Sequence, residues 1–154
     1  MIYRMVYMSE ATKDFGALEL AHLLDTARRK NAAAGLTGVL IFHENRFFQV
    51  LEGPQGRVID CLRTIKKDKR HSTIRVIEES ASPTRAFPNW RMGYAQPDAM
   101  HPAVRQSVFS IYRLVSPLSE ERGDDDAVRL HVRDFLASLV RLHGKAPLSQ
   151  SMSA

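Results

Sequence analysis

Cysteine is scarce in this sequence. Its single cysteine, Cys61, excludes an intramolecular disulfide and any metal site built on a cysteine pair. Long hydrophobic runs are also absent, because no stretch approaches the roughly 18 apolar residues of a membrane-spanning helix. The N-terminus has no basic segment followed by a long apolar stretch, so we expect no signal peptide. These absences favour a reduced, cytoplasmic protein without membrane contact.

The motifs of common enzymes and metal sites are missing as well. The six histidines include no pair four residues apart with a carboxylate, and neither a GxGxxG nor a P-loop motif occurs. Residues 35–38 (GLTG) precede a strand rather than a helix, so they predict a tight turn and no phosphate site. Cys61 falls on the apolar side of a predicted helix, where an inert, buried thiol is expected. We therefore expect no bound metal and no enzyme activity.

The composition is that of a folded globular protein. With 154 residues, 44% hydrophobic and 25% charged, the chain predicts one domain with a short appendage. The net charge of +5 permits an acidic partner without requiring one. The one dense basic run, residues 66–70 (KKDKR), has no interleaved aromatic residues. We interpret it as a solvated helix end and expect no nucleic-acid partner.

Hydrophobic periodicity predicts an α+β fold. Apolar spacing predicts a helix over residues 17–30 and a second helix marked by Val58, Cys61, Leu62 and Ile65. Alternation and short apolar runs predict strands over residues 2–8, 39–42, 47–51 and 74–77, with a possible extra strand over 90–94. The order β-α-β-β-α-β is that of a ferredoxin-like sheet. We expect both helices on one face and the first and third strands adjacent, parallel and central, which makes Tyr7 and Gln49 neighbours.

The C-terminal third predicts a helical appendage. We divide the chain into a domain over residues 1–96, an appendage over 97–145 and a flexible tail over 146–154. Two short apolar stripes, over residues 104–115 and 128–139, predict helices too small to form a core alone. A ferredoxin-like sheet has one face without helices, so we expect both to pack there.

Three polar residues stand where a core is expected. Gln49 interrupts an apolar strand, Tyr7 ends another, and Asn31 lies at the end of the first helix. Each alone is more typical of a polar group satisfied within the structure. Together they predict a slot for a flat polar ligand.

Five segments in order resemble the BLUF family of blue-light sensors over residues 1–95. They are residues 3–9 (YRMVYMS), 31–38 (NAAAGLTG), 48–53 (FQVLEG), 65–71 (IKKDKRH) and 87–92 (FPNWRM). The resemblance implies a ferredoxin-like sheet with a flavin held between its two helices. FAD is the implied cofactor, with FMN left open.

The resemblance also implies roles for individual residues. Tyr7 matches the photoactive tyrosine, Gln49 the switching glutamine and Asn31 the residue that hydrogen-bonds the polar edge of the flavin. It places Asp68, Arg70 and His71 near the ribityl and phosphate end, and Trp90 and Met92 in signal output. The sequence departs from the family at Lys30, where Asn or His is common, and at Thr64, where a basic or imidazole side chain is common. We place Lys30 with the cofactor-binding residues.

The implied mechanism is photochemistry without turnover. Tyr7 lends an electron and a proton to the excited flavin, Gln49 rearranges, and the flavin ends in its original redox state with an altered hydrogen bond. No effector domain fits into residues 99–154, so we expect a downstream partner protein and homo-oligomeric assembly. The alternative is a flavin-free ferredoxin-like module that binds an acidic or nucleic-acid partner.

Overall fold

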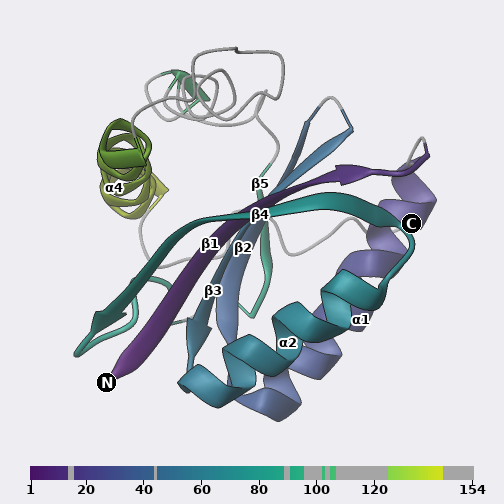
Figure 1. The fold of residues 1–154 in the computed structure, drawn as a ribbon, viewed down its shortest axis with the longest axis horizontal. Helices are drawn as coiled ribbons and strands as arrows, with labels where there is room; N and C mark the ends of the chain where they lie inside the picture. The colour runs from purple at the N-terminus through teal and green to yellow at the C-terminus, as the bar shows by residue number, and fades with distance from the viewer. Residues whose placement is uncertain are drawn as a thin grey trace.

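The computed structural model describes residues 1–13, 16–43, 45–88, 91–95, 102, 105–106 and 125–143. A five-stranded sheet of order β4-β1-β3-β2-β5 separates helices α1 and α2 on one face from helix α4 on the other (Figure 1). Along the chain the elements are β1 (Ile2–Ala11), α1 (Ala17–Ala34), β2 (Thr37–His43), β3 (Arg46–Gly53), α2 (Gln55–Lys67), β4 (His71–Ser82), β5 (Gly93–Ala95) and α4 (Asp125–His143).

The predicted ferredoxin-like order is confirmed, but one predicted strand direction is wrong. Strands β1 and β3 are adjacent and central as expected, yet they pair antiparallel rather than parallel. The crossover through α1 makes β1 parallel to β2, and β3 returns from β2 through a hairpin. Because β3 inserts between β1 and β2, it runs antiparallel to both.

The predicted turn after α1 is also confirmed. Gly35 ends the helix in the left-handed conformation, with φ of 68°, and its N–H donates to the carbonyl of Ala32. The helix extends beyond the predicted residue 30 to Ala34, because three alanines with high helix propensity follow Asn31. This extension places Asn31 on the helix, three residues before its end.

The core lies between the sheet and helices α1 and α2. Alternating residues of β1 and β3 point to this side, and they meet leucines of both helices. The buried cluster consists of Met5, Tyr7, Leu20, Leu24, Leu36, Leu40, Phe47, Leu51, Val58, Leu62 and Met92. Tyr7 is therefore part of the core and not of the surface.

Helix α4 covers the opposite face, as predicted for the second appendage helix. Phe135 of α4 meets Phe48 of β3 edge to face, with ring centroids 5.2 Å apart, and both side chains are buried. Arg133 approaches Glu78 of β4 to 4.0 Å. The other predicted appendage helix, most of residues 97–124 and the tail lie outside the described residues. Within the described part of the chain, no helix is long and apolar enough to cross a membrane.

Gly38 permits the close approach of β2 and β3, and this generates a stability prediction. A Cβ at residue 38 would lie 1.9 Å from the backbone oxygen of Val50, so the strand would have to shift. We expect Gly38→Ala to lower the free energy of unfolding by about 1–3 kcal/mol, measured by urea denaturation. Gly56→Ala is the control, because nothing lies within 4 Å of that position. Equal stabilities of the two variants would contradict this account.

Candidate functional site

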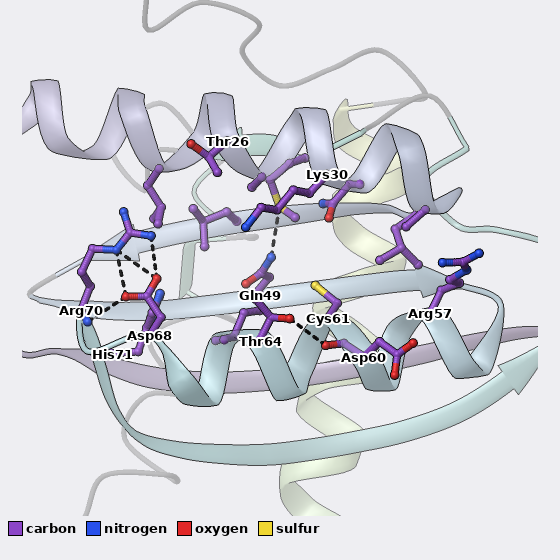
Figure 2. A pocket seen from close by; sticks show the side chains of 18 residues that line it. Thr26, Lys30, Gln49, Arg57, Asp60, Cys61, Thr64, Asp68, Arg70 and His71 are labelled. Atoms are coloured by element: carbon purple, nitrogen blue, oxygen red, sulfur yellow. Dashed lines mark hydrogen bonds and ion pairs between the residues drawn. The ribbon is translucent and has the colours of Figure 1, made fainter.

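A cavity of about 230 Å³ opens between α1, α2 and the sheet. Aliphatic side chains of α1, β2 and Ile65 of α2 line its middle, and polar side chains stand at its floor, along both helices and at both ends (Figure 2). The predicted site residues Lys30, Asn31, Gln49, Asp68, Arg70, His71 and Met92 all line this cavity. Tyr7 does not line it, and Trp90 lies outside the described residues.

Gln49 lines the floor of the cavity, and it is paired with Tyr7 of the neighbouring strand, which does not line the cavity. Tyr7 of β1 and Gln49 of β3 are register partners, and the Tyr7 hydroxyl donates to Oε1 of Gln49. Tyr7 is fully buried, and Gln49 is 7% exposed. Burial, with a smaller effect from Cys61, raises the pKa of the Tyr7 phenol well above its usual value. The phenol therefore stays protonated and acts as the hydrogen-bond donor at neutral pH.

The amide ends of Gln49 and Asn31 both contact the segment that leads into β5. Nε2 of Gln49 donates to the sulfur of Met92 at 3.5 Å, the contact drawn above Gln49 in Figure 2. Nδ2 of Asn31 donates to the backbone carbonyl of Arg91 at 3.2 Å. A thioether is a weak acceptor, so Gln49 is held less firmly at Nε2 than at Oε1.

A paired arginine stands at the end of the cavity beyond α2. Nε of Arg70 lies 3.0 Å from both carboxylate oxygens of Asp68, and its Nη2 lies 2.6 Å from Oδ2. These hydrogen bonds lower the pKa of Asp68 and raise the pKa of Arg70, so both stay charged. Asp68 thus positions the guanidinium at the cavity end, in agreement with the predicted grouping of the two residues.

His71 completes this end of the cavity. Its Nδ1 lies 3.1 Å from the Ser9 hydroxyl, and its ring packs against the ring of Phe47 at an angle of 52°, with centroids 4.6 Å apart. Burial lowers the pKa of His71, although the charge of Asp68 opposes that effect. A neutral imidazole is therefore expected at pH 7.

Sequence reasoning missed the cavity-facing side of α2. Arg57 and Cys61 line the cavity together with Thr64 and the predicted site residue Asp68, at a spacing that follows one side of a helix. Cys61 was assigned to the apolar core, and it is only partly buried. Its expected inertness agrees with the structure, because burial raises the pKa of the thiol. The helical spacing of Arg57 and Cys61 from Thr64 and Asp68 was the signal that could have identified the two missed residues.

The arrangement suits a flat heteroaromatic ring with one polar edge and an anionic tail. Aliphatic walls favour the ring, and the amides of Asn31 and Gln49 offer donors and acceptors to its edge. The cations Lys30 and Arg70 suit a phosphate. Among the described residues, no three His, Cys, Asp or Glu side chains converge as a metal site.

Known proteins with related sequences are light sensors. Residues 2–93 match the family model described as "Sensors of blue-light using FAD". The blue light- and temperature-regulated antirepressor BluF of Escherichia coli (strain K12) is 32% identical over 87 residues, which cover 56% of this chain and 22% of that protein. The photoactivated adenylate cyclase subunit beta of Euglena longa is 32% identical over 84 residues, 54% of this chain. The chain spans only 10% of the length of that cyclase subunit.

Solved structures agree with the fold. The dark-state structure of the BLUF protein BlrB has a TM-score of 0.67 at 26% identity, covering 90% of this chain and 97% of that one. The ground state of BlsA has a TM-score of 0.69 at 24% identity and covers 88% of each chain. These likenesses do not favour the flavin-free binding module. The matched family model covers well over half of the sequence, and the chain belongs to the BLUF family of blue-light sensors that use flavin.

Proposed function

We propose that the cavity between α1 and α2 holds FAD and that Tyr7 and Gln49 form the light-operated switch beside it. The observation that carries the proposal is the buried Tyr7–Gln49 hydrogen bond at the cavity floor. It joins a neutral phenol to an amide that can present either its oxygen or its nitrogen to a ligand.

The residues present fit a flavin. Aliphatic side chains such as Ala27 and Leu40 would contact its ring, and Asn31 and Gln49 would contact its polar edge. Arg70, positioned by Asp68, and His71 would contact the ribityl phosphate, with Lys30 as a second cation. FMN shares the ring and that phosphate and is the second candidate cofactor.

Lys30 and Thr64, the two positions that depart from the family pattern, differ in what they can contribute to phosphate binding. The Thr64 hydroxyl already donates to the carbonyl of Asp60 at 3.1 Å, so it adds little to phosphate binding. Lys30 has an exposed ammonium group at the cavity, which can reach either a phosphate or solvent. We assign the phosphate contact mainly to Arg70.

The switch follows from the hydrogen bonds of Gln49. Bound flavin would supply blue-light absorption and a strong excited-state oxidant. Tyr7 would pass an electron and the proton that it shares with Oε1 of Gln49 to the bound flavin, and it would recover both when the ground state returns. In the interval the Gln49 carboxamide would rearrange, by rotation or by tautomerisation, because its Nε2 donates to the weak acceptor Met92. The result is an altered hydrogen bond at the cavity with no net chemistry.

We place the output in Trp90, Met92 and the appendage, with residues 1–96 as sensor, 97–145 as appendage and 146–154 as tail. Helix α4 rests on the face of β3 opposite Gln49, through Phe48 and Phe135. A shift in β3 can therefore reach α4, and light-dependent hydrogen exchange in residues 125–143 tests this route. The chain acts as a non-enzymatic cytoplasmic homo-oligomer and signals to a downstream partner protein.

An absorption spectrum tests the function directly. The purified chain should be yellow, should release FAD on denaturation, and should show a reversible red shift of the flavin bands under blue light. Chromatography of the released flavin separates FAD from FMN. A colourless protein that added flavin does not convert would contradict the proposal and support the flavin-free module.

The switch residues generate a mutational prediction. We expect Tyr7→Phe and Gln49→Leu to remain yellow but to lose the red shift, because each removes one member of the hydrogen-bonded pair. The measurement is the light-minus-dark absorption difference of the purified variants. Tyr3→Phe is the matched control, since the Tyr3 hydroxyl bonds to Glu79 outside the cavity. A normal shift in either switch variant would remove that residue from the mechanism.

Flavin affinity generates a second prediction. Asn31→Ala and Arg70→Ala should each weaken binding by about 1–3 kcal/mol, measured by titrating apoprotein with FAD. The Arg70 effect should be larger at low salt, because ions screen a phosphate contact. Arg29→Ala is the control, since its ion pair with Asp25 is exposed and lies outside the cavity lining. Affinities equal to wild type in both variants would refute these contacts.

A further inference from the structure

A buried carboxylate lies on the face of the sheet away from the cavity. Glu52, near the end of β3, is fully buried. It follows Gln49 by three positions along the strand, an odd number, so the two side chains point to opposite faces of the sheet. A buried carboxylate is costly unless charged and polar partners surround it.

Glu52 has such partners, and two of them come from one loop. Its Oε1 accepts from Nε of Arg4 at 2.9 Å and from the backbone N–H of Ala86 at 2.9 Å, and its Oε2 accepts from the N–H of Phe87 at 3.0 Å. Nη2 of Arg4 completes the ion pair at 2.9 Å. Both carboxylate oxygens therefore hold the loop that follows β4.

Arg85 fastens the same loop a second time. Its Nη1 donates to Oγ1 of Thr37 at 2.9 Å and to the backbone carbonyl of Glu52 at 3.1 Å. Its Nη2 donates to the carbonyl of Gly35, the left-handed residue that ends α1, at 2.7 Å. We call the side chains of Glu52, Arg4 and Arg85 the clamp. We call the chain segment that they fasten, residues 85–88 and 91–92, the strap.

The other end of the strap lies at the cavity. Asn31 donates to the carbonyl of Arg91, Gln49 to the sulfur of Met92, and Arg28 donates to the carbonyl of Met92 at 3.1 Å. The strap is thus fixed by the clamp at residues 85–87, and at residues 91–92 it holds the two amides assigned to the flavin. Loss of clamp contacts would therefore change the positions of the Arg91 carbonyl and the Met92 sulfur, which accept from Asn31 and Gln49.

We propose that the clamp is a positioning element that sets the lifetime of the light-switched state, by holding Met92 and the Arg91 carbonyl against Gln49 and Asn31. The inference rests on the proposed function, because it assigns the clamp an effect on the Gln49 rearrangement. Gln49 must leave or regain its contact with Met92 to switch. A more mobile strap lowers the barrier to breaking and re-forming the Gln49–Met92 contact, and it therefore speeds the return to the dark state.

Arg85→Ala is the decisive variant, because it removes three strap contacts from a partly exposed side chain and leaves the buried Glu52–Arg4 pair intact. We expect its thermal recovery after blue light to be about two- to thirtyfold faster than wild type, the range typical of coupling through packed contacts. Arg85→Lys keeps the positive charge and one donor nitrogen in place of two, so its recovery rate should be intermediate. Folded Glu52→Gln protein should also recover faster than wild type. The control Arg29→Ala should recover at the wild-type rate.

Recovery in Arg85→Ala that is no faster than in wild type and Arg29→Ala would overturn the proposal. Hydrogen exchange in the dark is the second readout: peptides over residues 91–95 should exchange faster in Arg85→Ala than in the control, and unchanged exchange would also overturn it. A wild-type chain that binds flavin without any light-induced shift would refute the proposed function instead. In that case the dark-state hydrogen exchange of residues 91–95 still tests whether the clamp holds the strap.

Discussion

The hydrogen bond between Tyr7 and Gln49 is the constraint on which the site depends. Both side chains are buried on the two central strands, directly opposite each other, and face helices α1 and α2. A carboxamide in that position needs partners for its oxygen and its nitrogen. Tyr7 satisfies the oxygen, and among the described residues the nitrogen donates only to the Met92 sulfur. The central pairing of the sheet therefore leaves one end of the amide available for a ligand.

The surrounding structure holds this amide from two sides. The cavity side provides aliphatic walls and the Asp68–Arg70 pair at one end. On the opposite side, Glu52 and Arg85 fasten the loop that brings Met92 to Gln49. A glutamine with one firm and one weak hydrogen bond can exchange the weak contact for a contact to a ligand, and the proposed switch requires that exchange.

Much of the fold was predictable because periodicity and chain order determine it. The two helices, the hairpin, the Gly35 turn and the pairing of Tyr7 with Gln49 follow from apolar spacing and the β-α-β-β-α-β order. The direction of β3 relative to β1 was predicted wrongly, although the same connections determine it. The cavity-facing position of Arg57 and Cys61 was not predicted, although their helical spacing indicates it, and the burial of Glu52 was not predicted either. That burial depends on tertiary contacts with Arg4 and with the loop after β4, and no local pattern around a glutamate before a glycine indicates that its carboxylate is enclosed.

The central claim is that light changes the hydrogen bonding of the Gln49 side chain. A light-minus-dark infrared difference spectrum, recorded with isotope-labelled glutamine in the flavin-loaded chain, tests it most directly. The account predicts a label-sensitive amide band that reverses in the dark and is absent from Gln49→Leu. A difference spectrum in which the glutamine label shifts no band, although the flavin bands respond to light, would contradict it.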